Sequence, residues 1–336
     1  KEEFTKRVND ILDYNELIAY FQFIGEEIKE KQKRSSISGI ANFLEQWLQD
    51  DYAFARILTK NLSKETITLT YRCLDPSLLS KEIIEEAHST IIMSGTLTPT
   101  SMYRELLGFP KDKTIEKEYP SSFPPENRLS LIIPKTTTKF TRRNKDEYKR
   151  IAGILAEITN SIPGNSAVFF PSYKLRDNVC EYFTQFCNKT IFMEMPELSK
   201  KEKQELLERF KSYKDSGAVL LGVASANYAE GIDLPGDLLK GVIVVGLPLQ
   251  KPDLETKELI DYYEHKFGNG REYGYLFPAM TRCFQSAGRC IRTEKDRGVI
   301  IFLDERYVWK TYRKYFPSEW NVITTNLYKN KIINFF

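Results

Sequence analysis

The first part of the chain has apolar residues at helical spacing. Phe4 and Val8 share one face of a helix, and Phe43 and Trp47 share another, because residues four positions apart lie one above the other. The polar stretch 31–39 separates the two runs. We therefore expect residues 1 to about 60 to be helical, with one break. No residue of this part suggests chemistry.

The pattern then changes to alternation. Thr66–Arg72 alternates polar and apolar residues and predicts a strand, and Asp75 with Pro76 opens a short helix. The apolar run Ser89–Met93 predicts a second strand. It leads into Ser-Gly-Thr at 94–96, a polar segment at a strand end, where open α/β sheets gather ligands. An ordinary turn before a helix explains the same residues.

From Arg128 onward, short continuous apolar runs alternate with amphipathic helices. Such strands are buried on both faces, so the pattern predicts an α/β fold: a parallel sheet with helices on both sides. The expected strands are 129–133, 167–170, 191–195, 218–223, 242–246 and 299–303, and the expected helices are 146–161, 173–186, 199–213, 253–267 and one that carries Arg289.

Composition narrows the class of protein. The 336 residues leave room for two domains, and 41% hydrophobic with 28% charged residues is typical of a soluble globular protein. The net charge is only +3, so any nucleic-acid surface must come from local clustering. No apolar run approaches the roughly 18 residues that cross a bilayer, so we expect no membrane association.

The cysteines and histidines suggest no metal site. Five cysteines lie at 73, 180, 187, 283 and 290, spacings that suit helix faces rather than a Cys-x-x-Cys site, and there are only two histidines. We expect reduced, mostly buried thiols in an intracellular protein. The first residues, Lys-Glu-Glu-Phe, suggest a fragment of a longer chain.

One stretch is locally basic. Residues 135–150 hold seven lysines and arginines, with Phe140 and Tyr148 among them. Basic residues interleaved with aromatic ones are typical of surfaces that bind single-stranded DNA. A flexible solvated loop is the other interpretation, and the sequence leaves both open.

The loop 227–236 follows an apolar strand. Gly231 permits unusual backbone geometry, while Glu230 and Asp233 can accept hydrogen bonds from arginine or from a nucleotide sugar. A polar surface loop would have the same composition.

The stretch 285–292 reads Gln-Ser-Ala-Gly-Arg-Cys-Ile-Arg. On a helix, Arg282, Gln285, Arg289 and Arg292 share one face, whereas Cys283, Ala287, Cys290 and Ile291 fall on the other. Guanidinium groups match phosphate oxygens and keep their charge, and Gly288 allows a ligand close approach. An ordinary amphipathic helix with solvated arginines is the alternative.

Five short motifs, in this order, resemble the C-terminal half of an XPD-type DNA helicase, a family of the second helicase superfamily that contains an iron–sulfur cluster. They are Ser-Gly-Thr-Leu-Thr-Pro at 94–99, Phe-Phe-Pro-Ser-Tyr at 169–173, Glu-Gly-Ile-Asp at 230–233, Gln-x-x-Gly-Arg-x-x-Arg at 285–292, and Asp-Glu-Arg-Tyr at 304–307. The likeness covers roughly residues 66–310. It implies the end of an arch domain at 1–65, the last part of motor domain one and a linker at 66–119, and a RecA-like motor domain two at 120–336.

The resemblance also implies residue roles. Gln285, Arg289 and Arg292 would act in catalysis by facing ATP bound on the other motor domain. ATP binding and its coupling to DNA would involve Gly288, Glu230, Gly231, Asp233, Ser94, Gly95 and Thr96. DNA would lie near Ser172, Tyr173, Ser225 and Asn227, and the residues 224–227 lack basic side chains, so contacts there would rest on hydroxyl, amide and backbone groups.

The sequence departs from the family in its nucleotide site. Walker A and Walker B elements, which position ATP and Mg²⁺, are absent from these 336 residues, and the five cysteines lack the spacing that holds the family's iron–sulfur cluster. We therefore expect that the chain does not hydrolyse ATP alone. The implied partners are single-stranded DNA, the missing motor domain one and proteins of a repair complex.

The leading hypothesis is the C-terminal motor portion of an ATP-dependent 5′-to-3′ DNA helicase in nucleotide excision repair. Its polarity and pathway come from the resemblance, which places the protein in the cytoplasm of a prokaryote or the nucleus of a eukaryote. A DinG-like helicase has similar motifs. A non-catalytic module that binds single-stranded DNA or a protein partner is the alternative from another class.

Overall fold

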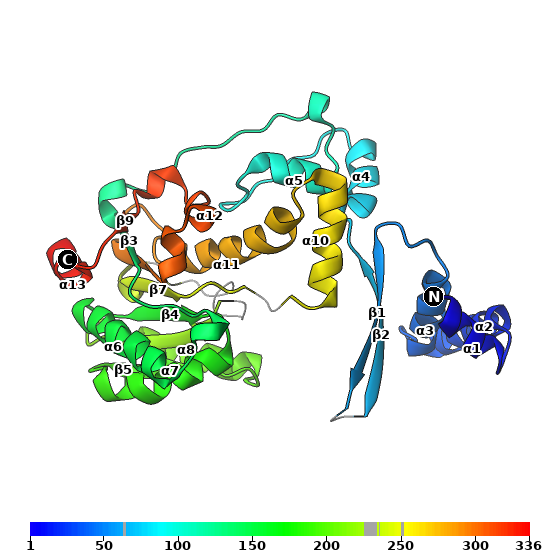
Figure 1. Ribbon diagram of the computed structural model, residues 1–336, viewed down its shortest axis with the longest axis horizontal. Helices are drawn as coiled ribbons and strands as arrows, with labels where there is room; N and C mark the ends of the chain where they lie inside the picture. Colours follow the sequence, from blue (N-terminus) through cyan, green and yellow to red (C-terminus); the bar gives the residue numbers. More distant parts are fainter. Residues whose placement is uncertain (63–64, 225–233, 235, 250–251) are drawn as a thin grey trace. The chain divides into compact units, whose positions relative to one another are not determined.

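The computed structural model describes residues 1–62, 65–224, 234, 236–249 and 252–336. The chain forms two compact units (Figure 1). Unit 1 comprises 1–92, 101–115 and 252–270, and unit 2 comprises 93–100, 116–251 and 271–336. Each unit is therefore built from segments that are distant in sequence.

Unit 1 begins with three helices, where the hydrophobic spacing predicts two, because the chain breaks at 10–13 as well as in the predicted polar stretch. These are α1 (Glu2–Asn9), α2 (Tyr14–Lys31) and α3 (Ser36–Trp47). Asp13 caps α2 by accepting hydrogen bonds from two backbone N–H groups, and the Ser35 hydroxyl caps α3 by accepting one from Ser38 N–H. Tyr14, Ile18 and Leu44 form the small core between α2 and α3.

The helical prediction extends too far at its end. Phe54–Asn61 form strand β1, which pairs antiparallel with β2 (Thr66–Cys73). The register places Phe54 opposite Cys73, and the Phe54 ring stacks on Tyr71 with the ring centroids 4.6 Å apart. The apolar spacing of a short segment fits either period, and here the partner strand decides the outcome.

The rest of unit 1 is helical. It contains α4 (Ser77–Glu86), α5 (Thr100–Leu107), the 3₁₀ turn η1 (Lys111–Lys113) and α10 (Leu254–Phe267). Unit 1 includes α5 from its second residue, Ser101, onward. The predicted strand at 89–93 is wrong. A strand needs a hydrogen-bonded neighbour, and neither sheet among the described residues includes this segment, whose residues are exposed.

Unit 2 contains the predicted parallel sheet. Its strand order is β5-β6-β4-β7-β8-β3-β9, and every neighbouring pair is parallel. The fold class is therefore confirmed: a RecA-like α/β domain preceded by a helical segment. The strands are β3 (Arg128–Ile133), β4 (Ser166–Phe170), β5 (Thr190–Met193), β6 (Ala218–Val223), β7 (Gly241–Val245), β8 (Gly298–Leu303) and β9 (Ile323–Thr324).

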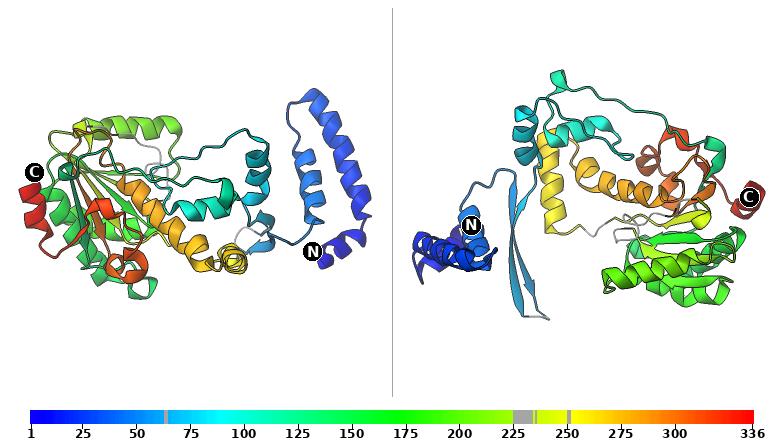
Figure 2. Two further views of the ribbon diagram at one scale, coloured as in Figure 1. Left: turned by 90° about the horizontal axis from the view of Figure 1, so that it is seen from above. Right: turned by 180° about the vertical axis from the view of Figure 1, so that it is seen from behind.

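Helices cover both faces of this sheet (Figures 1 and 2). One core lies beneath α6 (Lys145–Ser161), α7 (Tyr173–Phe186) and α13 (Tyr328–Phe335), and the other lies beneath α8 (Lys200–Lys211) and α11 (Phe277–Ala287). Successive residues of a strand point to opposite cores, so Val168 joins the first and Phe169 the second. The strands are consequently apolar throughout.

Short elements complete unit 2. Helix α12 spans Lys310–Arg313, and a π-helical turn, η5, spans Glu272–Leu276 before α11. A capping box begins α8, with Ser199 and Glu202 bonded reciprocally. The 3₁₀ turns are η2 (Pro125–Asn127), η3 (Phe140–Arg142), η4 (Gly236–Leu238), η6 (Glu305–Val308) and η7 (Ser318–Trp320).

Within the described ranges, none of the helices combines the length and apolar character that spanning a bilayer requires.

A buried carboxylate attaches α10 to the rest of unit 1. Asp75 is 2% exposed and accepts hydrogen bonds from Tyr262 (2.8 Å) and Lys266 (2.5 Å) of α10, as well as from Ser77. Burial raises the pKa of Asp75, but these hydrogen bonds outweigh it and leave the pKa below its ordinary value of 3.8.

We predict that Lys266→Met lowers the free energy of unfolding by roughly 2–4 kcal/mol, because it leaves the buried Asp75 carboxylate without its cation. Lys257→Met, an exposed change on the same helix, is the control. A lowered carboxyl pKa stabilises the fold above about pH 3.8 and loses this effect as pH falls through the folded pKa. The difference in unfolding free energy between the unsubstituted chain and Lys266→Met, measured with urea, should therefore be smaller at pH 3 than at pH 7. Equal differences at the two pH values would contradict the assignment.

Candidate functional site

The carboxyl ends of the parallel strands meet at one edge of the unit 2 sheet, where open α/β folds bind ligands. Strand β4 leads into α7 on one face, whereas β7, its neighbour, precedes α11 on the other. The chain therefore diverges to opposite faces beside β4. Ser172 and Tyr173, two predicted DNA-binding residues, follow β4 directly at this point.

Both residues are fixed locally. The Ser172 hydroxyl caps α7 by accepting a hydrogen bond from Leu175 N–H at 3.3 Å. The Arg176 guanidinium lies over the Tyr173 ring, 4.9 Å from its centroid, and Arg176 itself donates to the Glu194 carbonyl. Burial raises the pKa of Tyr173, so its hydroxyl keeps its proton at neutral pH. The pair offers a hydroxyl and an aromatic ring at the sheet edge.

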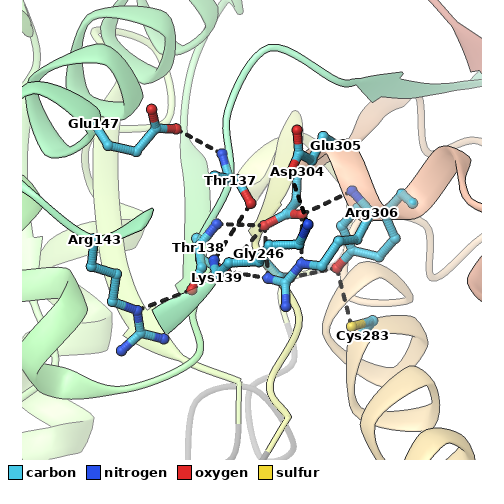
Figure 3. A network of polar contacts seen from close by, with 11 residues as sticks. Thr137, Thr138, Lys139, Arg143, Glu147, Gly246, Cys283, Asp304, Glu305 and Arg306 are labelled. Carbon is cyan, nitrogen blue, oxygen red and sulfur yellow. Dashed lines mark hydrogen bonds and ion pairs between the residues drawn. The ribbon is translucent and has the colours of Figure 1, made fainter. Parts of the chain in front are cut away.

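A buried polar network lies farther along this edge (Figure 3). Asp304 follows β8, is fully buried, and accepts bonds from Thr138 N–H at 2.8 Å and from both Nε and Nη2 of Arg306 at 2.8 Å. Arg306 also donates to the Thr138 hydroxyl at 2.6 Å. The segments after β3 and β8 are thereby joined.

Strand β7, which neighbours β8 on its other side, participates as well. The Tyr307 hydroxyl donates to the Gly246 carbonyl at 2.6 Å and lies 3.2 Å from Cys283 Sγ of α11. Gly246 has a φ of +66°, and a Cβ there would lie 2.1 Å from Thr138 Oγ1, so a side chain would disrupt the network. Three neighbouring strand ends are thus held together.

The arginine motif is only partly helical. Helix α11 ends at Ala287, with Gly288 as its C-cap, so Gln285 lies on the helix whereas Arg289 and Arg292 lie in the turn that follows. The prediction that Arg289 and Arg292 share a helical face with Arg282 and Gln285 is wrong. Cys283, Ala287, Cys290 and Ile291 are buried, as predicted, and burial of the last two draws the chain down toward β8.

Asp296 fixes this turn. Its carboxylate accepts hydrogen bonds from the N–H groups of Arg292 (2.7 Å) and Thr293 (2.9 Å), and from Gly236 N–H at 3.0 Å. Burial raises the pKa of Asp296, but the hydrogen bonds outweigh it and lower the pKa overall. Arg292 is therefore presented from an anchored backbone, with its side chain exposed.

The arginine motif and the β4 end lie at opposite edges of the sheet. Helix α11 runs back over the sheet and ends beside the amino ends of the strands (Figure 1), where Cys290 Sγ contacts the Val299 carbonyl at 3.6 Å and Val299 N–H bonds to Lys240. A six-residue strand is about 20 Å long. The structure consequently separates the predicted nucleotide-facing residues from the predicted DNA-binding ones.

The other predicted site residues are distributed as follows. Ser94 and Gly95 are exposed, and the Ser94 hydroxyl lies 3.3 Å from that of Thr96 and accepts a bond from Thr96 N–H. These hydroxyls form a local turn. Ser225, Asn227, Glu230, Gly231 and Asp233 lie outside the described residues.

Sequence reasoning assigned no role to Thr138 or to Asp304 and Arg306. Asp304 and Arg306 lie in the Asp-Glu-Arg-Tyr motif, which contributed to the family resemblance but to no residue role. Charged residues that directly follow a continuous apolar strand are carried into the protein interior, where they must pair with another group. The place of Asp304 and Arg306 just after such a strand was therefore the signal that could have found them.

Comparison with known proteins identifies the family. The family model for helicase C-terminal domains matches residues 155–322. The chain belongs to this helicase family. The predicted resemblance to XPD-type helicases is likewise confirmed by the relatives described next.

The ATP-dependent DNA helicase CHL1 of Candida albicans is 30% identical to this helicase chain over 293 residues, covering 76% of the chain and 34% of the relative. The XPD/RAD3 helicase subunit of general transcription and DNA repair factor IIH of Saccharomyces cerevisiae is 28% identical, covering 84% and 38%. The chain thus spans about a third of the length of these relatives. Solved structures of an XPD helicase and of apo XPD share its fold, with TM-scores of 0.62 and 0.63 and identities of 22% and 23%, covering 86% and 89% of the chain and 50% and 60% of theirs.

The buried thiols around the arginine motif yield a prediction. Burial raises the pKa values of Cys283 and Cys290 to about 12. We expect iodoacetamide at pH 8 to modify the half-buried Cys73 and Cys187 before either, as peptide mass spectrometry would reveal. Their raised pKa values stabilise the fold fully below about pH 9, and this effect is lost as pH rises toward 12. Equal modification rates for Cys73 and Cys283 would contradict the burial.

Proposed function

We propose that this chain is the C-terminal motor portion of an ATP-dependent 5′-to-3′ DNA helicase that translocates on single-stranded DNA, acting in nucleotide excision repair. One observation carries the proposal. The anchored turn with Arg289 and Arg292 lies about 20 Å from the sheet edge that carries the Ser172 hydroxyl and the Tyr173 ring. A translocating motor needs two such places, one for nucleotide and one for the strand. Relatives named as ATP-dependent DNA helicases support the same assignment.

In this proposal Gln285, Arg289 and Arg292 face the phosphates of ATP that is bound, with Mg²⁺, on motor domain one. Phosphoryl transfer is accelerated mainly by positioning and by neutralising spread negative charge, and guanidinium groups do both. Since the arginines come from a different domain than the rest of the nucleotide site, hydrolysis would depend on closure of the two domains. The Asp296 anchor keeps the turn ready for that contact.

The coupling residues belong to the same proposal. Ser94, Gly95 and Thr96, with Gly288, Glu230, Gly231 and Asp233, would link the nucleotide site to the strand. Ser172 and Tyr173, with Ser225 and Asn227, would contact DNA. The missing motor domain one and proteins of a repair complex are the proposed partners.

We predict that this chain alone shows no ATP turnover stimulated by single-stranded DNA, and that turnover appears when motor domain one is restored. In the restored protein, Arg289→Ala and Arg292→Ala should each lower kcat by roughly 10³-fold or more, because each removes charge stabilisation of the transition state. Steady-state ATPase assays measure this.

Lys295→Ala is the matched control, since it removes an exposed positive charge from the same turn. It should leave turnover within about twofold. Undiminished ATPase in the Arg289→Ala and Arg292→Ala double variant would overturn the assignment of these arginines and favour a module that only binds DNA or a protein partner.

A further inference from the structure

The basic stretch that follows β3 is anchored from beneath. Thr136, Thr137 and Thr138 are 2–3% exposed, although they follow the strand in a polar, basic segment. Glu305 N–H donates to the Thr136 carbonyl at 2.7 Å, and Thr137 N–H donates to Glu147 at 2.7 Å. Together with the bond from Thr138 to Asp304, each of the three residues has its own fixed partner. The interpretation of a flexible solvated loop does not fit this backbone.

The anchored segment presents one aromatic and two basic side chains. Phe140 is 85% exposed, in the short 3₁₀ turn η3, and Arg142 is exposed beside it. Arg143 Nε donates to the Thr138 carbonyl at 3.0 Å, and its guanidinium lies 5.8 Å from the Phe140 ring centroid. Figure 3 shows the remaining nitrogen atoms of Arg143 directed away from that carbonyl. An exposed ring thus lies beside a guanidinium held in place.

Lys139 is already occupied. Its Nζ lies 4.0 Å from the Trp309 ring centroid and 3.4 Å from the Glu305 carboxylate. These contacts fix the side chain and partly neutralise its charge, so we leave Lys139 out of the presented surface.

The local charge favours an anionic ligand. Residues 135–150 contain seven lysines and arginines but only Asp146 and Glu147 as acids, and Glu147 is turned inward to Thr137. A large exposed ring adjoining this charge matches the combination that binds single strands: phosphates pair with basic groups, and a base stacks on the ring. A double-stranded ligand keeps its bases stacked and would leave Phe140 without a partner.

We propose that Phe140, Arg142 and Arg143 form a binding site for a base of single-stranded DNA and its adjoining phosphates, and that Asp304, Arg306 and Thr138 position this site from the buried side. The choice of DNA rests on the proposed function. The site lies at the same sheet edge as Ser172 and Tyr173, because β3 and β4 are parallel and separated by β7 and β8. Three strand spacings correspond to about 14 Å, a distance that a few nucleotides can span.

The first experiment compares two oligonucleotides of equal charge. Fluorescence anisotropy measures binding of the 336-residue chain to an oligothymidylate of twelve nucleotides and to an abasic oligomer of the same length. We expect Phe140→Ala to weaken oligothymidylate binding about 5- to 100-fold and to leave abasic binding within twofold, because only a base can stack. Phe186→Ala, which removes a 40% exposed ring from the end of α7, should change neither. Equal losses for both ligands, or none, would overturn the stacking role.

The arginines are tested by salt dependence. Arg142→Ala with Arg143→Ala should weaken binding of both oligomers and reduce the slope of log K against log salt by about 0.7 for each phosphate that no longer pairs with a guanidinium. Lys201→Ala, an exposed charge on α8 whose side chain is 88% exposed, serves as the control and should leave the slope unchanged. An unchanged slope in the double variant would remove these arginines from the site.

The positioning role needs a variant that keeps the fold. Thr138→Val removes the hydroxyl that bonds to Asp304 and Arg306, yet it retains the side-chain shape and the backbone bond to Asp304. We expect it to weaken oligothymidylate binding several-fold, and Thr138→Ser to restore it. In a double-mutant cycle, Phe140→Ala should have a smaller effect in the Thr138→Val background, because a displaced ring no longer stacks. Additive effects would mean that Thr138 stabilises the fold without positioning the site.

These measurements are independent of nucleotide hydrolysis. The titrations use this chain without ATP or motor domain one, so a loss of oligonucleotide binding in the Phe140 variant and a loss of ATPase in the arginine-turn variants test different statements. Tighter binding of duplex DNA than of the single strand would overturn the site even if the ATPase results agree with the proposed function.

Discussion

The Asp304 carboxylate has no access to water, and a buried charge is tolerated only when it is paired and hydrogen-bonded. Arg306 and Thr138 supply that pairing. The consequence extends beyond one ion pair, because the partners come from the ends of different strands. Satisfying a single carboxylate therefore fixes the segment after β3 and orients the turn after β8, and Tyr307 of that turn reaches Gly246. The geometry of this sheet edge depends on the network.

The opposite edge uses a similar solution with a different acid. Asp296 holds the turn that carries Arg292, through backbone N–H groups rather than through a cation. Because the two anchors lie at the two ends of one rigid sheet, ligands bound there would be separated by the length of a strand. A motor can use such a separation, since a change at one ligand then reaches the other through the domain as a whole.

The sequence predicted the sheet of unit 2 well because its strands are apolar on both faces and the signal is continuous, as at 218–223 and 299–303. It failed where a partner decides the conformation. Residues 54–61 form a strand because β2 lies beside them, and 89–93 do not, since no strand of the described residues pairs with them. The predicted helix extends too far, through Arg289, because Cys290 and Ile291 continue the helical spacing of apolar residues. In the structure these two residues are buried although they lie in the turn after the helix.

The sequence by itself determined the fold class, the order of strands and helices between residues 128 and 303, and the family, since apolar periodicity and short motifs are local properties. Only the tertiary structure decided which residues meet. It placed Gln285, Arg289 and Arg292 far from Ser172 and Tyr173, although both groups lie in recognisable motifs. It also converted the basic stretch after β3 into an anchored surface, because the carboxylate that holds Thr138 lies 166 residues away in the chain. Periodicity carries no information about such a contact, which arises only when parallel strands bring distant ends together.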